Sequence, residues 1–306
     1  DSYRPTQPKF TGTKVFEDFP LETLRKYIDW TPFFITWSLA GKYPAILQDE
    51  TVGEAARDLF SDAQEMLNEI IEQKLLKAKA VIGFWPANRS GDNDVDLFGN
   101  DGDQLPIETL HFLRQQVPKD KELSNLSLAD YIAPAGYDDY MGGFAVTAGI
   151  GANALSARYE KENNDYASLM VKSLADRLAE AFAEHMHLLV RKEFWGYAAD
   201  EKLANQELIK EKYQGIRPAP GYPACPDHSE KEALFKLLNA SEEIGIELTE
   251  SFAMTPAASV SGFYFAHPEI KYFPVGKITE DQVKDLAQRK GQPVEEVSKL
   301  LNPNLA

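Results

Sequence analysis

A proline-rich stretch near residue 220 carries several side chains that could bind a small molecule. Residues 217–230, called the ribbon below, read RPAPGYPACPDHSE. They combine an anion-binding arginine with an aromatic Tyr222, a lone Cys225 and a lone His228. Four prolines within ten residues exclude a helix and remove four backbone donors, so the ribbon must be extended. Gly221 permits a positive φ or the close approach of a ligand. The ribbon is either a pocket wall or a stiff linker between helices, and composition alone favours neither.

Acidic residues occur in two settings that could face a cation. Asp29 stands at the start of an aromatic run, DWTPFFITW, where a lone buried charge is costly unless it is paired. Its alternative role is to cap the segment that follows Pro32. Three acidic residues recur at steps of four on one helical face: Asp176, Glu180 and Glu184. Such a stripe is usually solvated, but the absence of an intervening lysine leaves room for a cation site.

Several familiar motifs are present only in part. Residues 149–154 read GIGANA, but a dinucleotide site needs a following second strand, and 165–194 has a helical pattern. The DNDVD run at 92–96 resembles a calcium loop, yet Leu97 replaces the loop glycine and Asp103 the closing glutamate, which favours a turn. Cys225 and His228 have no second ligand pair for zinc. We therefore expect no metal bound by this chain.

Composition narrows the classes of partner. The chain has 306 residues, of which 43% are hydrophobic, and a net charge of −16. That charge argues against nucleic acid and against anionic membranes as partners. A single cysteine excludes an internal disulfide and suits a reducing compartment. The polar opening has no signal-peptide core, and no uncharged run is long enough to span a membrane. We expect a cytoplasmic, monomeric module cut from a longer polypeptide.

Hydrophobic periodicity predicts the elements that position these residues. Helices are expected at 21–28, 52–76, 165–194, 230–244, 279–290 and 294–301. Strands are expected at 80–85, 95–98, 107–113, 142–147 and within 252–265. Pro86 is expected to end its strand, and Ser229 to cap the helix after the ribbon. The buried stripe of the second helix is expected to be Ala55, Leu59, Ala63, Met66 and Ile70.

The order of these elements indicates the fold class. Strands and helices occur in blocks instead of strict alternation, which favours an α+β fold with a central antiparallel sheet flanked by helices. Residues 1–20 are polar and contain prolines, so they are expected to form a surface arm or linker. Residues 21–306 are expected to form one domain.

Three separated stretches carry a resemblance to a known family. The first comprises YIDWTPFF at 27–34 and WSLAGKYP at 37–44, and the second is ADRLAEAFAE at 175–184. The third is GIRPAPGYP at 215–223, continued by SVSG at 259–262 and by Lys271-Tyr272. Together they resemble the C-terminal activation domain of cobalamin-dependent methionine synthase. The similarity covers nearly the whole chain beyond the first 20 residues.

The resemblance implies a C-shaped single domain that binds S-adenosylmethionine. In that family the domain presents the methyl donor to cob(II)alamin held by a neighbouring domain of the same polypeptide. An electron from flavodoxin or a flavoprotein reductase makes cob(I)alamin, which takes the methyl group. The chain would thus be part of a 5-methyltetrahydrofolate–homocysteine methyltransferase, as a reactivation module without a complete active site. Its negative charge should repel an acidic flavodoxin, so docking needs a local basic patch or another reductase.

The resemblance also implies the ligand-binding residues. They are Asp29, Glu180, Arg217, Pro218, Ala219, Gly221, Tyr222, Tyr272 and Phe273, with Asp176 facing cobalamin. Arg217 suits the α-carboxylate as a planar fork, and Asp29 suits the α-ammonium. The carbonyls of 217–221 are expected to be free for the adenine or ribose, and the aromatic residues offer π faces.

Two alternatives belong to other classes of function. One is a self-contained S-adenosylmethionine-dependent methyltransferase acting on a small acceptor, which predicts turnover by the isolated chain. The other is an interaction domain with a vestigial pocket, which predicts no binding of S-adenosylmethionine.

Overall fold

The computed structural model describes residues 3–99, 105–120 and 123–306. Within these residues, six strands form a central sheet with the order β4-β3-β2-β5-β8, and β1 also pairs with β2. Every pair in this sheet is antiparallel, as predicted. The strands are β1 Gly12–Phe16, β2 Lys77–Ser90, β3 Asp94–Phe98, β4 Pro106–His111, β5 Tyr140–Ile150 and β8 Ser259–Tyr264. A separate two-stranded hairpin consists of β6 Glu247–Leu248 and β7 Met254–Thr255.

Strand β2 is the longest strand of the sheet and pairs with three others. One edge pairs with β5, while the other pairs first with β1 and then with β3. The prediction that Pro86 ends this strand was wrong, since the strand continues to Ser90. Ala87 donates its N–H to the Asp139 carbonyl on the β5 side at 2.9 Å. The donor that Pro86 lacks would therefore point to the other edge, into the gap between β1 and β3, where no ladder bond is lost.

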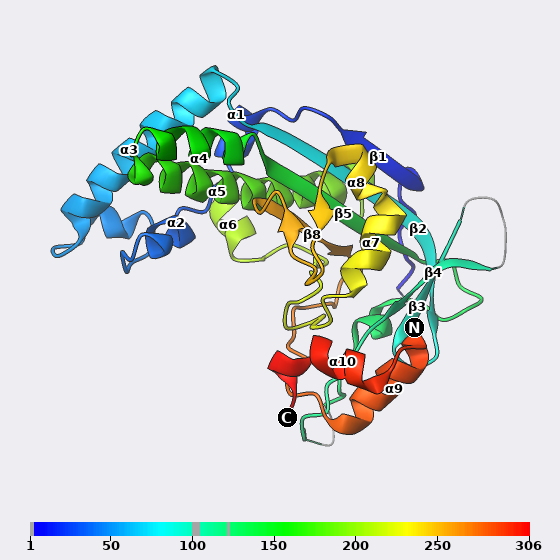
Figure 1. Ribbon diagram of the computed structural model, residues 1–306. Helices are drawn as coiled ribbons and strands as arrows, with labels where there is room; N and C mark the ends of the chain where they lie inside the picture. The colour runs from blue at the N-terminus through cyan, green and yellow to red at the C-terminus, as the bar shows by residue number, and fades with distance from the viewer. Residues whose placement is uncertain (1–2, 100–104, 121–122) are drawn as a thin grey trace.

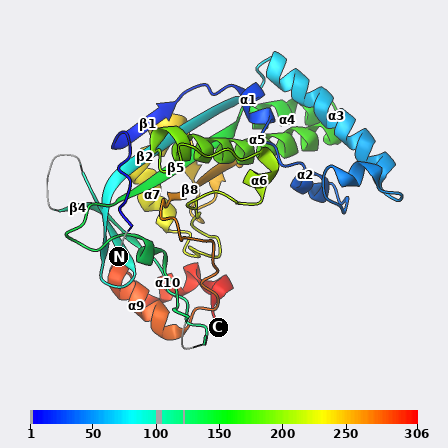
Figure 2. The same cartoon turned by 180° about the vertical axis from the view of Figure 1, so that it is seen from behind.

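Helices cover both faces of the sheet, as Figures 1 and 2 show from opposite sides. The first core packs α1 to α5 on Ala80, Ile82 and Phe84 of β2. The second packs α7 and α8 on Val81 and Trp85 and continues to α9 and α10. This alternation along β2 is the period of two that a strand buried on both faces requires. The helices are α1 Leu21–Arg25, α2 Thr31–Thr36, α3 Gly53–Glu72, α4 Ala152–Lys161, α5 Asp165–Leu189, α6 Asn205–Ile209, α7 Glu230–Leu238, α8 Ala240–Ile244, α9 Glu280–Lys290 and α10 Val294–Leu300.

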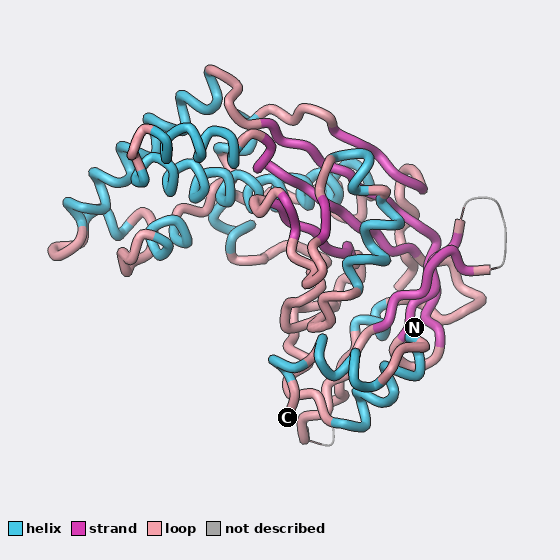
Figure 3. Tube along the Cα trace, in the orientation of Figure 1, coloured by secondary structure: helices cyan, strands magenta, loops and turns pink. Residues whose placement is uncertain are grey.

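The molecule is curved, in agreement with the expected C shape. Figure 1 shows α2 and α3 at one end of the arc and α9, α10 and the C-terminus at the other. Figure 3 shows loops gathered on the inner side of the curve. The ribbon and the loop after β8 meet, because Val275 donates its N–H to the Pro223 carbonyl at 2.7 Å. No helix of the described residues is long and apolar enough to cross a membrane.

Three sequence predictions about the helices need correction. The buried stripe of α3 contains Ala56 and Leu67 instead of Ala55 and Met66. The helix face that packs on the core repeats every three or four residues from Ala56. The expected helix over 230–244 breaks at Asn239, whose φ is 50°, into α7 and α8. Ser229 does not cap α7: its backbone is already helical, and its hydroxyl donates to the Asp227 carboxylate at 2.7 Å.

The expected surface arm also takes part in the fold. Its residues Gly12–Phe16 form β1 against β2. Upstream, the Thr6 carbonyl accepts the indole N–H of Trp195 at 2.7 Å. The division of the chain at residue 20 remains a prediction, although part of the arm belongs to the sheet.

Candidate functional site

The ribbon is an edge of the sheet and not a linker. Ile216, just before it, exchanges two backbone hydrogen bonds of 3.0 Å with Phe265, just after β8. Phe263 in β8 donates its N–H to the Pro218 carbonyl at 2.9 Å. Gly262 permits this contact, because a Cβ there would meet the Pro218 oxygen at 2.8 Å. The hydrogen bonds favour the pocket-wall interpretation, since they fix the ribbon along β8.

Gly221 turns the ribbon in the way its sequence predicted. Its φ is +95°, a region that favours glycine, and a Cβ there would lie 2.1 Å from the imidazole of His228. Its N–H donates to the Cys225 carbonyl at 2.7 Å. His228 therefore packs against the turn, and Cys225 is buried beside it, where burial raises the pKa of its thiol. Neither side chain lines the cavity described next.

The ribbon forms one wall of a cavity of about 600 Å³, a volume within the usual range for small-molecule sites. Most of the wall is apolar, and a few polar groups converge on it. The lining residues are Glu180, Glu211, Arg217, Pro218, Ala219, Pro220, Tyr222, Pro223, Ala224, Lys231, Met254, Ser259, Val260, Ser261, Tyr272, Phe273 and Pro274. Seven of the residues predicted for the ligand site are among them.

Arg217 is held firmly at this cavity. Its guanidinium donates to Glu184 of α5 at 2.8 Å and to the Tyr213 hydroxyl at 2.9 Å. Its backbone N–H donates to the Tyr272 hydroxyl at 3.0 Å. Burial alone would lower the pKa of Arg217, but the Glu184 carboxylate and the nearby tyrosines outweigh it and raise that pKa. The group is a permanent cation at the cavity wall.

Two carboxylates and one lysine add charge to the cavity. Glu180 of α5 stays accessible from the cavity, yet the protein around it removes much of its hydration. This desolvation raises the pKa of Glu180, and Asp176 adds repulsion while Arg177 and Arg217 oppose it. Burial likewise raises the pKa of Glu211 and lowers the pKa of Lys231. Negative groups thus stand close to the Arg217 cation.

Sequence reasoning missed Glu211, Lys231, Met254 and Ser259. Glu211 follows α6 with a φ of 53° and is placed by the N–H it donates to the Leu208 carbonyl at 2.8 Å. They come from the loop after α6, from α7, from β7 and from β8, and only the fold brings these segments to one cavity.

Asp29 and Gly221 do not line the cavity. The Asp29 carboxylate accepts the N–H of Thr31, the first residue of α2, at 3.0 Å, but the N-cap position considered as its alternative is occupied by Trp30. Gly221 contributes the turn behind Tyr222. Asp176 lies one helical turn from Glu180 on α5 and pairs with Arg177. The binding role of Asp29 therefore remains a prediction without support from the cavity.

The expectation of free ribbon carbonyls was wrong for two residues. The Pro218 carbonyl accepts the N–H of Phe263, and the Ala219 carbonyl accepts the N–H of Tyr222 at 3.1 Å. Proline removes donors from the ribbon, but β8 and the turn at Gly221 supply donors from elsewhere. Within the described residues, no hydrogen bond reaches the carbonyls of 217, 220 and 221.

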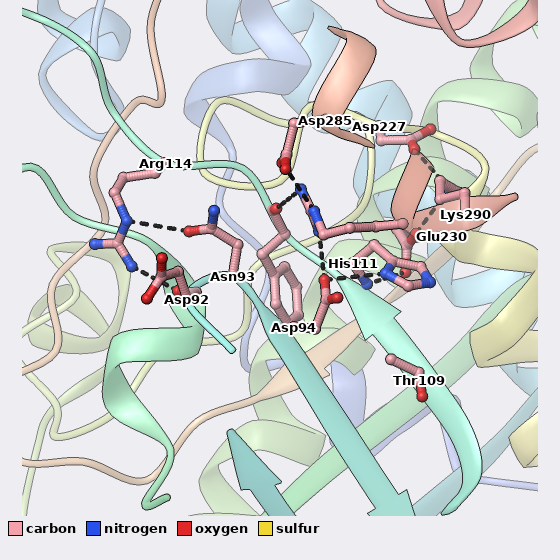
Figure 4. Close-up of polar contacts among 12 residues, drawn as sticks. Asp92, Asn93, Asp94, Thr109, His111, Arg114, Asp227, Glu230, Asp285 and Lys290 are labelled. Carbon is pink, nitrogen blue, oxygen red and sulfur yellow. Dashed lines mark hydrogen bonds and ion pairs between the residues drawn. The ribbon is translucent and has the colours of Figure 1, made fainter. Parts of the chain in front are cut away.

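A second polar cluster lies between β3, β4, α7 and α9 (Figure 4). The DNDVD run belongs to it: the Asp92 backbone carbonyl and the Asn93 side-chain amide oxygen accept hydrogen bonds from Arg114, while the Asp94 carboxylate binds His111 and Arg289. The Asn93 amide oxygen and the Asp94 carboxylate are thus occupied by arginine and histidine, and the Asp96 carboxylate accepts the Thr109 hydroxyl at 2.7 Å. The described residues contain no group of three or more histidine, cysteine or acidic side chains that could hold a metal ion.

Comparison with known proteins identifies the family. The family model described as vitamin B12 dependent methionine synthase, activation domain, matches residues 20–291. The chain belongs to this family. A crystal structure of the MetH reactivation domain bound to AdoHcy is 52% identical, with a TM-score of 0.96, over 100% of this chain and 94% of that one. The activation-domain family was predicted from the three sequence stretches, and that prediction is confirmed, as is the predicted fold.

Proposed function

We propose that the cavity binds S-adenosylmethionine and presents its methyl group for the reductive remethylation of cobalamin. The observation that carries this proposal is Arg217, a partly buried cation with unused donors, in an apolar cavity that also holds carboxylates. S-adenosylmethionine has matching parts: an α-carboxylate, cationic ammonium and sulfonium groups, and a flat adenine. The related reactivation domain was crystallised with AdoHcy, the demethylated form of this ligand.

Each part of the ligand has a partner in the lining. Arg217 suits the carboxylate, and Glu180 and Glu211 suit the two cationic centres. Tyr222, Tyr272 and Phe273 provide aromatic faces, and the ribbon prolines an apolar wall, for the adenine. Asp176 and Glu180, on the same face of α5, would face the incoming cobalamin.

The residues of this chain bind and orient; they transfer no proton. Cobalamin on a neighbouring domain of methionine synthase, once reduced by one electron, would supply the nucleophile and its electron pair, and would accept the methyl group. The methyl group leaves the sulfonium, and the sulfur keeps the electron pair of the broken bond. The role of the ribbon and α5 is to hold the methyl group within reach of the metal, since correct placement supplies most of the rate gain. The isolated domain then has no complete active site.

Titration calorimetry tests the binding step. We expect S-adenosylmethionine to bind the wild-type chain and Arg217→Ala to bind it about 100-fold more weakly, because charged hydrogen bonds are lost. Arg158→Ala removes the same charge from the exposed face of α4 and should change nothing. No heat with wild type, or equal affinities for both variants, would refute the proposal.

A reconstituted assay tests the reactivation step. The chain is mixed with cob(II)alamin in its cobalamin-binding domain, a reductant and S-adenosylmethionine, and methylation is followed by absorbance. We expect methylation only when all components are present. Methyl transfer to a small acceptor by the chain alone would instead support the self-contained methyltransferase.

We also propose the wider setting of this domain. Its partners are the cobalamin-binding domain of the same polypeptide and a flavodoxin or flavoprotein reductase in the cytoplasm. The net charge of −16 would repel an acidic flavodoxin and weaken its binding relative to a basic reductase. Salt therefore distinguishes reductases: screening should speed electron transfer from an acidic donor and slow it from a basic one.

A further inference from the structure

The groups behind Arg217 form a buried polar network. Glu184 and His187 lie one turn apart on α5, and both contact the guanidinium, with His187 Nδ1 at 3.2 Å from Nη1. Tyr213 contacts the same Nη1 from the loop before the ribbon. His187 is fully buried, and Tyr213 nearly so. The three partners come from two separate segments, so the fold fixes the guanidinium from two directions.

His187 accepts from Arg217 and is neutral. Arginine has donors only, so Nδ1 must carry the lone pair and Nε2 the proton. Nε2 is 3.4 Å from the Tyr197 hydroxyl, which can accept that proton's hydrogen bond. Burial lowers the pKa of His187, and the two neighbouring cations, Arg191 and Arg217, lower it further. This tautomer is therefore kept under physiological conditions.

One edge of the Arg217 guanidinium keeps N–H donors that no described residue uses. Guanidinium has five N–H groups. Nη1 donates its two hydrogens to His187 and Tyr213, and Nη2 donates one to Glu184. Among the described residues, Nε–H and the second Nη2 hydrogen have no partner. Two donors from neighbouring nitrogens are what a carboxylate needs.

The backbone of Arg217 is fixed as well. Its N–H is bonded to Tyr272, and the preceding Ile216 is paired with Phe265 in both directions. Both ends of the arginine side chain are therefore held before any ligand arrives. A group that is already ordered loses less entropy on binding than a free surface arginine.

We propose that His187 and Tyr213 are positioning residues for ligand binding. By saturating Nη1 they turn the Nε and Nη2 edge of Arg217 toward the α-carboxylate of the methyl donor. The inference rests on the proposed function, since it assumes S-adenosylmethionine as the ligand. It goes further by assigning the geometry of the carboxylate fork to two side chains that do not line the cavity.

A comparison of two ligands tests this assignment. Calorimetry is carried out with S-adenosylmethionine and with its decarboxylated analogue, which lacks only the group that Arg217 would bind. Wild type should bind the complete ligand more tightly. Tyr213→Phe and His187→Leu should each weaken the complete ligand on the order of tenfold, through loss of a charge-assisted hydrogen bond, and leave the analogue unchanged.

Two further variants act as controls. His187→Asn keeps an acceptor near the place of Nδ1 and should restore most of the affinity that His187→Leu loses. Tyr264→Phe removes a buried hydroxyl without a partner in the described residues, from a ring stacked 5.3 Å from His187, and should change neither ligand. Thermal unfolding checks that each variant is folded.

The outcomes separate the two proposals. Equal weakening of both ligands by Tyr213→Phe and His187→Leu would show a structural role only and overturn the inference. Unchanged affinity for both ligands would overturn it too. Failure of wild type to bind either ligand would refute the proposed function itself.

Discussion

Arg217 and Arg114 are both bonded to carboxylates, but they differ in what they leave unused. The Arg114 guanidinium donates five hydrogen bonds of 2.6–3.0 Å. One goes to the Asn93 side chain, one each to the carbonyls of Asp92 and Asn125, and two to the Asp130 carboxylate. The Arg217 guanidinium donates only three hydrogen bonds to the described residues, and it lines a cavity. A partly buried cation whose donors are all satisfied stabilises the fold, whereas one with unused donors at a cavity can bind a ligand.

Lys290 belongs with Arg114 in this comparison. Its three donors reach Asp227, Ser229 and Glu230 at 2.7–2.8 Å (Figure 4). The cluster connects α9 to the end of the ribbon and the start of α7. Lys290 lies next to the ribbon, but all three of its N–H groups are bonded within the protein, so we assign it a role in stability and not in ligand binding.

The largest effect should come from Lys290→Met. Asp227 and Glu230 would be left as buried carboxylates without their cation, each with a side chain only 3% exposed. Breaking a buried pair in this way costs about 4 kcal/mol of unfolding free energy. Urea unfolding measures this loss. Lys284→Met, which breaks an exposed pair with Glu280, should cost less than about 0.5 kcal/mol.

The pH dependence of the same variant sharpens the assignment. Burial raises the pKa of Glu230, and Lys290 opposes that rise. For an acid with a raised folded-state pKa, stability is greatest at low pH and is lost as pH rises above the ordinary glutamate value of 4.5. Lys290→Met should therefore lose more stability at pH 8 than at pH 5. An equal loss at both values would argue against charge burial as the cause.

Arg114→Ala should affect stability and spare the ligand. It removes five hydrogen bonds and leaves Asp130 without its main partner, so we expect unfolding to become easier by about 3 kcal/mol. The affinity for S-adenosylmethionine should stay within about twofold of wild type, as the cavity lies elsewhere. A large loss of affinity in calorimetry would erase the distinction between the two arginines.

Gly221→Ala should disturb the ribbon to a smaller degree. Alanine at a φ of +95° is strained, and its Cβ would overlap the His228 ring, so we expect a cost of about 2 kcal/mol. Gly276→Ala is the matched control: its φ is +88°, but its Cβ would meet only Val117 at an ordinary 3.5 Å. It should cost about 1 kcal/mol from strain alone. Thermal unfolding of both variants isolates the clash, and identical shifts would contradict it.

The smallest effect concerns Glu180 and is seen only in binding. The pKa of this carboxylate is raised, so it loses its charge as pH falls toward 4.5 and with it the attraction for a cationic ligand. The affinity for S-adenosylmethionine should fall about threefold between pH 7.5 and pH 5, an effect of the size expected for an accessible charge pair. Glu180→Gln should bind with the weaker affinity at both values. A wild-type profile that is flat with pH would remove Glu180 from the cation site.

Much of the fold was accessible from sequence, because α3, α5 and α9 have strong helical periodicity and β2 and β5 are continuous apolar runs. Strand β1 was missed since its five residues alternate only weakly and lie among polar neighbours. Pro86 misled the assignment because the effect of a missing donor depends on which partner strand faces it. That information lies in the pairing of β1 and β3, not in the local sequence.

The site was predictable where residues share one segment. Arg217, Pro218, Ala219 and Tyr222 line the cavity because the ribbon places them together. The partners of Arg217 could not be found this way. Glu184 and His187 lie about 30 positions upstream on a helix, where Glu184 was assigned to an acidic stripe and no sequence pattern singled out His187. For Asp29, local sequence could not decide between an N-cap and ligand binding, and its carboxylate lies one residue before the N-cap, bonded to the N–H of Thr31.

The ribbon has one more consequence, for association between molecules. Through Ile216 and Pro218 the chain pairs with the edge of β8, which would otherwise present free N–H groups to a strand of another molecule. Its prolines at 218, 220, 223 and 226 have no N–H to offer on the outside. The same residues that wall the cavity thus protect the sheet from edge-to-edge aggregation.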